Sequence, residues 1–288
     1  MKDFIDKQID QNRNLNLFYC HLEDVVTIGK DFIKTILIAK RQGRDIEELI
    51  SYTVEKIVRI LYRINQYTHF SPSDLTVLQN IYRNTFEVIT EENPAEAMRQ
   101  HHKNLSKWLS MFYPEKFKTA LRDTPVIGQV VNEEYSPQLQ MEIYNIDPKS
   151  LREPVLDLGC GAKARLVKQL QFLGVHAIGI DRTLDEENSF CIKKDWFSYT
   201  FEKKTWGTII ANMSFTNHLL YTFQNDKEKL YAYLITYKEI LASLKNGGCF
   251  AYAPSVPMIE DRLDPSQYEV DRIEIAHGIY RSLIRTVC

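Results

Sequence analysis

A glycine-rich turn is the segment of the chain with the clearest chemistry. Residues 154–170, PVLDLGCGAKARLVKQL, place an apolar run, a turn containing Gly159 and Gly161, and an amphipathic run in immediate succession. Glycines have no Cβ and let a ligand lie against the backbone, and the start of a helix offers unpaired N–H groups. The sequence therefore predicts a strand, a cofactor-binding loop around Cys160, and a helix that begins near Ala162.

Two kinds of cofactor fit such a loop. Gly159-x-Gly161-x-x-Ala164 matches the dinucleotide fingerprint G-x-G-x-x-G/A, and Asp181 follows Gly161 by 20 residues, where a ribose-binding acid is expected. Asp157 argues against a dinucleotide, because its charge would repel a pyrophosphate. S-adenosylmethionine carries a sulfonium and an ammonium but no phosphate, so the charge of Asp157 favours this cofactor.

The motif Asp157-Leu158-Gly159-Cys160-Gly161 resembles the first motif of the class I S-adenosylmethionine-dependent methyltransferases. Later segments resemble that family in the same order, over residues 135–288, although Lys163 stands where many members have a third glycine. The resemblance implies S-adenosylmethionine as cofactor, a ribose-binding role for Asp181 and an adenine-binding role for Asp195-Trp196. The full set of expected cofactor-binding residues is Asp157, Gly159, Cys160, Gly161, Asp181, Arg182, Asp195, Trp196 and Asn212.

The methyl acceptor is expected beyond the fourth strand of this fold, at residues 212–218. Methyl transfer requires alignment of acceptor, methyl and sulfur, and removal of a proton where the acceptor carries one. His218 is the candidate general base, because the ordinary pKa of histidine, about 6.5, suits proton removal at neutral pH. Asn217 is the second candidate and could orient the acceptor. Both residues could instead cap or pack at the start of the following helix.

The spacing of apolar residues predicts the elements that position these side chains. Short β-rich runs alternate with helical stretches after residue 135, as expected for a Rossmann-like α/β sheet that is parallel and closes with a C-terminal antiparallel hairpin. The resemblance implies seven strands. The predicted strands are 154–158, 176–181, 189–193, 208–212 (206–212 by the resemblance), 249–254, 268–275 and 280–287, and the predicted helices between them are 162–173 and 227–244.

The first part of the chain has a different pattern, with apolar residues at helical spacing and no strand signal. One apolar stripe covers residues 22–37, and its helix is expected to end near Gly43. A second stripe begins at Ile46. Ser71-Pro72 and Asn93-Pro94 each place a capping side chain before a proline, which predicts two further helices to about residues 90 and 112. His101 is expected on the apolar side of the last helix. We predict an all-helical domain over 1–125, a linker over 126–136 and a cofactor-binding domain over 137–288.

Composition limits the classes of function. The 36 Lys and Arg residues nearly balance the 38 Asp and Glu residues, so a nucleic-acid partner is disfavoured but not excluded. The five cysteines are scattered and never spaced as C-x-x-C, so neither a disulfide framework nor a metal site is expected. The chain shows no signal-peptide pattern and no apolar run of membrane-spanning length, so we expect a cytoplasmic protein with no membrane partner.

These patterns predict an S-adenosylmethionine-dependent methyltransferase that modifies nitrogen or oxygen of a small-molecule or peptide-derived acceptor. Its helical domain would cover the acceptor pocket or form a homodimer interface. The alternatives are a methyltransferase acting on ribosomal RNA and a catalytically silent protein that binds the same cofactor. A nicotinamide dehydrogenase is the more distant alternative.

Overall fold

A computed structural model describes residues 2, 5–6, 33–43, 45–113 and 135–287. The chain divides into two compact units, Met1–Gln129 and Val130–Cys288. Most of the predicted linker, residues 126–134, lies outside the described residues, as does the start of the predicted stripe over 22–37. Each unit is described by itself below.

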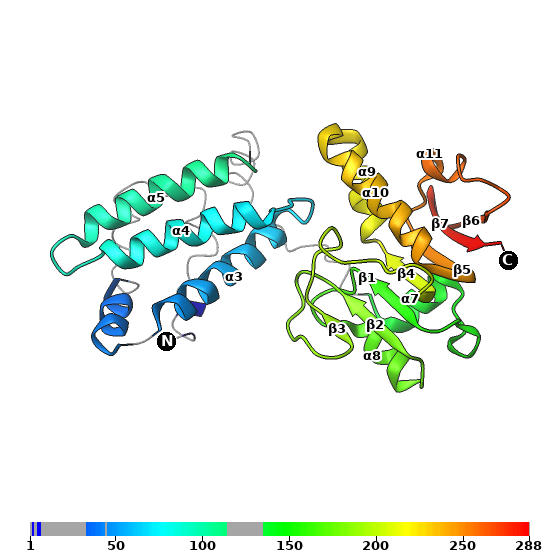
Figure 1. Cartoon of the computed structure of the whole chain (residues 1–288), viewed down its shortest axis with the longest axis horizontal. Helices are drawn as coiled ribbons and strands as arrows, with labels where there is room; N and C mark the ends of the chain where they lie inside the picture. Colours follow the sequence, from blue (N-terminus) through cyan, green and yellow to red (C-terminus); the bar gives the residue numbers. More distant parts are fainter. Residues whose placement is uncertain (1, 3–4, 7–32, 44, 114–134, 288) are drawn as a thin grey trace. The chain divides into compact units, whose positions relative to one another are not determined.

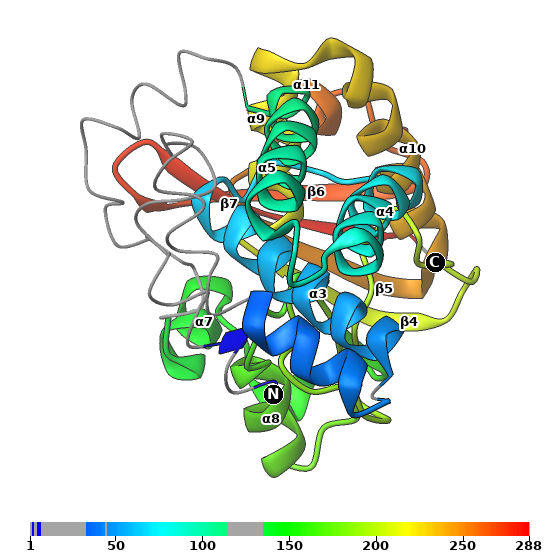
Figure 2. The same ribbon diagram turned by 90° about the vertical axis from the view of Figure 1, so that its left-hand side faces the viewer.

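The first unit is helical throughout its described part (Figure 1). Residues 33–41 are helical, and three longer helices follow: α3 (Ile46–Ile64), α4 (Pro72–Val88) and α5 (Pro94–Ser110). Helix α4 packs against both α3 and α5 (Figures 1 and 2). Each helix turns one apolar face to a shared core, which includes the stacked rings of Phe70 and Trp108, with centroids 5.2 Å apart.

The two predicted proline-associated helix starts differ in their caps. Ser71 forms the predicted cap, because its side chain accepts from the backbone N–H of Asp74 and Asp74 returns a bond to the Ser71 backbone. The prediction for Asn93 was wrong. Asn93 precedes α5 but makes no capping bond to it; its Oδ1 accepts from the Thr90 backbone N–H at 2.7 Å instead. The side chain therefore closes the preceding turn.

His101 is more deeply buried than the sequence suggested. Its Nδ1 lies 2.8 Å from the Thr85 hydroxyl on α4, and its ring meets Tyr82 edge-on. Burial, with a smaller contribution from His102, lowers the pKa of His101 to about 4. The residue is thus a neutral bridge between α4 and α5.

The second unit is a seven-stranded sheet with helices on both faces, in the strand order β3-β2-β1-β4-β5-β7-β6. Strands β1 to β5 are parallel, whereas β7 is antiparallel to both β5 and β6. The predicted α/β sheet with its C-terminal hairpin is confirmed. The strands are β1 (Val155–Leu158), β2 (Ala177–Ile180), β3 (Cys191–Ile192), β4 (Trp206–Asn212), β5 (Leu244–Ala253), β6 (Tyr268–Ala276) and β7 (Ile279–Thr286), and the helical segments are α7 (Pro137–Tyr144), the 3₁₀ turn η2 (Pro148–Ser150), α8 (Arg165–Phe172), α9 (Phe215–Asn225), α10 (Lys227–Ser243) and α11 (Pro257–Glu260).

Each face of the sheet has its own apolar core. Helices α9 and α10 pack on one face, through Phe215 and Tyr237 among others, against Leu158 and Phe250 of the strands. Helices α7 and α8 pack on the other face, through Tyr144 and Val167 among others, against Val155 of β1 and Ile210 of β4. Every residue of β4 is buried, as expected for a central parallel strand covered on both sides.

Two strand boundaries differ from the predicted ones. The predicted strand 189–193 is reduced to Cys191–Ile192, because Asn188 forms a tight turn that bonds Cys191 in both directions. Strand β5 begins at Leu244, five residues before the predicted start. Leu244 pairs with Trp206, and the register then shifts until Cys249 pairs with Thr208. Lys245 to Gly248 therefore bulge within the strand instead of separating it from α10.

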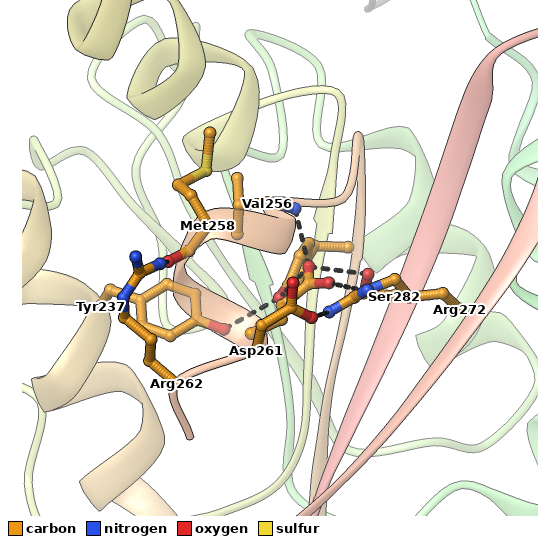
Figure 3. A network of polar contacts seen from close by, with 9 residues as sticks. Tyr237, Val256, Met258, Asp261, Arg262, Arg272 and Ser282 are labelled. Atoms are coloured by element: carbon orange, nitrogen blue, oxygen red, sulfur yellow. Dashed lines mark hydrogen bonds and ion pairs between the residues drawn. The ribbon is translucent and has the colours of Figure 1, made fainter.

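A buried carboxylate holds the segment that follows β5 (Figure 3). Glu260, at the end of α11, accepts from the hydroxyls of Tyr252 and Ser282, at 2.7 and 2.8 Å, and from the Val256 backbone N–H. Its other oxygen pairs with Arg272 of β6. Because these donors come from β5, β6, β7 and the turn into α11, one side chain links the antiparallel end of the sheet to α11.

Candidate functional site

The predicted glycine loop lies at the carboxyl end of β1, beside the turn that follows β4. Gly159 has φ +80°, and a Cβ built on it would lie 2.5 Å from Cβ of Ser214. The Ser214 hydroxyl donates to the Leu158 carbonyl at 2.6 Å, so the two turns are bonded to each other at this point. Only glycine fits between them.

Backbone bonds hold the loop against β2. The N–H groups of Gly159 and Cys160 both donate to the Ile180 carbonyl, at 2.8 and 3.2 Å. The Gly161 N–H donates to Oδ2 of Asp181 at 2.9 Å. The other Asp181 oxygen accepts from the backbone and hydroxyl of Thr183. Asp181 therefore orders the loop itself, and Oδ2, which accepts one bond, retains a lone pair for a ligand.

Asp157, in β1, is a buried acid beside the glycine loop. Only 2% of the residue is exposed, and its Oδ2 has no hydrogen-bond partner among the described residues. Burial, with a contribution from Asp181, raises the pKa of Asp157 to about 7. A buried acceptor of this kind suits a cation, and it would disfavour a pyrophosphate. The loop therefore fits the ammonium-bearing end of S-adenosylmethionine.

The predicted adenine-binding pair follows β3. Asp195 accepts from the Phe197 backbone N–H at 3.0 Å and pairs with Arg182 at 3.4 Å. Trp196 is 8% exposed and packs edge-on against Phe215, with centroids 5.6 Å apart. Its ring also reaches the glycine loop, since Cζ3 would lie 3.6 Å from a Cβ at Gly159. The pair thus borders the loop, with the indole packed into the core beneath it.

Asn212 ends β4, and its contact with α7 was not foreseen. Tyr144 donates to Oδ1 of Asn212 at 3.1 Å, with a longer contact to the Ala211 carbonyl. Both residues are buried. The two residues are 68 positions apart, and no spacing pattern in the sequence connects them. The phenol holds the Asn212 amide at the carboxyl edge of the sheet.

The two predicted catalytic residues lie in the first turn of α9. His218 is 7% exposed, and its ring meets Trp196 edge-on with centroids 5.0 Å apart. Asn217 is half-buried. Met213, in the turn before α9, has φ +49°, and its N–H donates to the Ala253 carbonyl at 2.8 Å. The turn after β4 is therefore tied to the ends of β1 and β5.

The structure brings most of the predicted residues to one edge of the sheet, at the carboxyl ends of β1, β2 and β4, where ligands of open α/β sheets bind. Within the described part of the chain, no cluster of three or more His, Cys, Asp or Glu side chains is suited to a metal ion. Over the same residues, no helix has the length and apolarity to cross a membrane.

The protein is similar to known proteins in its three-dimensional fold, and comparisons of its sequence found no match. No protein-family description and no curated protein matches the sequence. Similar solved structures include a protein of Pyrococcus horikoshii (17% identity over 60% of this chain and 100% of that one, TM-score 0.37). An rRNA methylase of Streptococcus thermophilus matches at 13% identity over 54% of this chain and 98% of that one, with TM-score 0.35.

A third similar structure is the 1,6-didemethyltoxoflavin-N1-methyltransferase of Burkholderia thailandensis with its acceptor and S-adenosylhomocysteine bound. It matches at 13% identity over 55% of this chain and 80% of that one, with TM-score 0.35. Two of these three similar structures are thus a methylase and a methyltransferase, and the acceptors in their names differ.

Proposed function

We propose that the protein is an S-adenosylmethionine-dependent methyltransferase that acts on nitrogen or oxygen of a small-molecule or peptide-derived acceptor. The observation that carries the proposal is Asp157, a buried acid whose Oδ2 has no hydrogen-bond partner among the described residues, beside a loop that requires glycine at position 159. A dinucleotide would bring negative charge to this place. A cofactor with an ammonium group would remove the cost of the buried charge.

Each residue of the edge has a part in holding this cofactor. Asp157 would accept from its ammonium group, Oδ2 of Asp181 would accept from a ribose hydroxyl, and Asp195 with Trp196 would border the adenine. When bound, S-adenosylmethionine supplies an electrophilic methyl group on a sulfonium. The tie between Ser214 and Leu158 keeps the turn after β4 at a constant distance from the loop, which favours alignment of an acceptor.

The acceptor would lie at the turn between β4 and α9. His218 is proposed as the base that takes the acceptor's proton, and Asn217 as a residue that orients the acceptor. The edge-on contact with Trp196 restricts the His218 ring, so the adenine-binding side chain and the proposed base would be positioned together. The near balance of charge on the chain favours a small or peptide-derived acceptor over RNA.

Calorimetric binding of S-adenosylhomocysteine at pH 8 tests the cofactor. The wild type should bind, and at 100 times its Kd the ligand should raise the free energy of unfolding by about 2.7 kcal/mol. Asp157→Asn should weaken binding by about tenfold or more, because a neutral amide replaces the partner of the ammonium. Glu186→Gln, which changes an exposed acid on the same unit, is the control. If NADH stabilised the wild type and S-adenosylhomocysteine did not, the cofactor would be a dinucleotide and the proposal would be wrong.

Transfer of radiolabelled methyl from S-adenosylmethionine tests the reaction class. Label should move into the small-molecule or peptide fraction of a cell extract and much less into RNA. His218→Gln should slow the transfer while leaving affinity for S-adenosylhomocysteine within about twofold. Binding with no transfer to any fraction would identify a silent cofactor-binding protein, and transfer into RNA would identify the nucleic-acid alternative.

A further inference from the structure

Arg281 of β7 is a buried cation that the proposed cofactor site does not use. The residue is 7% exposed, and its Nη1 has no hydrogen-bond partner in the part of the chain that the structure describes. No carboxylate of a described residue forms an ion pair with it. Removing a charge from water without a partner is strongly unfavourable, so a buried arginine of this kind has a ligand to bind or destabilises the fold.

Strand register shows where the side chain points. Tyr252 of β5 pairs with Ser282 of β7, which places Arg281 beside Ala253, at the carboxyl end of β5. The Ser282 side chain lies on the α10 face, where it reaches Glu260. Because side chains alternate along a strand, Arg281 lies on the opposite face, together with Leu283.

That face carries the residues that end β4. Tyr144 packs there and donates to Asn212. Burial and the Asp157 carboxylate raise the pKa of the Tyr144 phenol, and the Arg281 charge partly offsets this effect. In the sheet register, Asn212 of β4 pairs with Ala253 of β5, and Ala253 lies beside Arg281 of β7. Arg281 therefore lies at the same edge as Asn212 and the Tyr144 hydroxyl bonded to it, where the acceptor is expected.

Asp157 and Arg281 lie on one face of the sheet, and each has a buried polar atom without a hydrogen-bond partner among the described residues. Strands β4 and β5 lie between β1 and β7, so the two residues are separated by three strand spacings, about 14 Å across the sheet. Asp157 lies at the glycine loop, and Arg281 lies beside the last residue of β5. A pair of ligands, or one extended ligand, would have to reach both.

We propose that Arg281 binds an anionic group of the methyl acceptor, a carboxylate or a phosphate, beside the Tyr144 hydroxyl. The guanidinium fork matches either group with two parallel hydrogen bonds. The inference rests on the proposed function and narrows its substrate class to anionic acceptors. The carboxylate of the cofactor is the other source of the same chemistry, and the position of Arg281 beside β5, away from the glycine loop, favours the acceptor.

Binding measurements on Arg281→Met and Arg281→Lys test the proposal, with Arg285→Met, an exposed arginine on the same strand, as control. Inorganic phosphate, titrated into protein saturated with S-adenosylhomocysteine, is the anionic probe. Arg281→Met should weaken phosphate binding by about tenfold or more, Arg281→Lys by less, and Arg285→Met by no more than twofold. Equal phosphate affinity in the wild type and Arg281→Met would overturn the proposal.

Binding of cofactor analogues distinguishes an anionic group of the acceptor from the carboxylate of the cofactor. Affinity for S-adenosylhomocysteine should be the same in the wild type and Arg281→Met. A tenfold loss for S-adenosylhomocysteine, with none for 5′-methylthioadenosine, which lacks the amino-acid part, would assign Arg281 to the cofactor and overturn the acceptor assignment. A wild type that binds no S-adenosylhomocysteine would contradict the proposed function, while phosphate binding by the unliganded variants would still decide the role of Arg281.

Thermal unfolding without ligand supplies the structural control. Arg281→Met should raise the Tm, because an apolar side chain replaces an unpaired buried charge. A fall in Tm larger than that of Arg285→Met would show that Arg281 supports the fold and would contradict a ligand-binding role.

Discussion

Asp157 illustrates how a single buried acid couples stability to pH. Its pKa in the folded protein is raised to about 7, mainly by burial, whereas an unfolded chain would have a value near 3.9. The folded state therefore keeps a proton that the unfolded state releases between about pH 4 and 7. The stabilising contribution is complete below pH 4 and is lost as the pH rises through 7.

Asp157→Asn should remove this dependence. The variant gains stability relative to the ligand-free wild type as the pH rises, by up to about 4 kcal/mol between pH 4 and pH 8 for a pKa difference of about three units. Denaturant unfolding at several pH values measures the difference. A stability difference that does not change with pH would contradict the assignment.

Predictions for single residues were correct where residues adjacent in the sequence determine the local backbone structure. Gly159 and Gly161 form the predicted turn because the backbone there needs positive φ. The partner of Tyr144 and the burial of Arg281 could not be foreseen, because the residues around them come from segments brought together only by the sheet. Asn93 was misjudged because asparagine can bond its own preceding turn as readily as the helix that follows.

At the scale of elements, the contact between the glycine loop and the turn after β4 determines which substitutions the site tolerates. Gly159→Ala would place a Cβ against Ser214, which has no freedom to withdraw because its hydroxyl is bonded to Leu158. The variant should lose most of its affinity for S-adenosylhomocysteine and unfold at lower denaturant. Gly278→Ala is the matched control, with φ +73° and open space around the added Cβ.

Gly278→Ala separates the effect of backbone strain from that of a steric clash with Ser214. Both substitutions place alanine at positive φ, at a cost of about 1 kcal/mol. Calorimetry and denaturant unfolding should therefore show a small stability loss and unchanged cofactor affinity for Gly278→Ala. Equal effects of the two variants would mean that the loop does not meet Ser214 closely.

Elements with strong periodicity were predicted closely, and irregular ones were not. Helix α3 runs from Ile46 to Ile64 along the predicted stripe. Strand β5 starts early because two glycines, Gly247 and Gly248, continue the strand through a bulge, whereas such residues usually mark a turn. The network around Glu260 was also missed. A buried acid carries no pattern in the sequence, and its donors lie as far away as Ser282.

At the scale of the whole chain, the two units have separate cores. Among the described residues, the buried core of the first unit extends to Tyr113, and the buried residues of the two cores in the second unit begin at Tyr144. We expect thermal unfolding in two transitions, because each core can be lost without the other.

A ligand should reveal which transition belongs to which unit. S-adenosylhomocysteine at 100 times its Kd should stabilise the sheet unit by about 2.7 kcal/mol and leave the other transition where it was. Differential scanning calorimetry with and without the ligand makes the comparison. A single transition that shifts as a whole would show that the units unfold together.

The placement of the tryptophans has a practical consequence. Trp108 is the one tryptophan of the first unit and stacks on Phe70, while Trp196 and Trp206 both belong to the sheet unit. Fluorescence of a Trp108→Phe variant would therefore come from the sheet unit alone. Because the Trp196 indole borders both the glycine loop and His218, its emission would serve as an intrinsic optical reporter of cofactor binding, with no added dye.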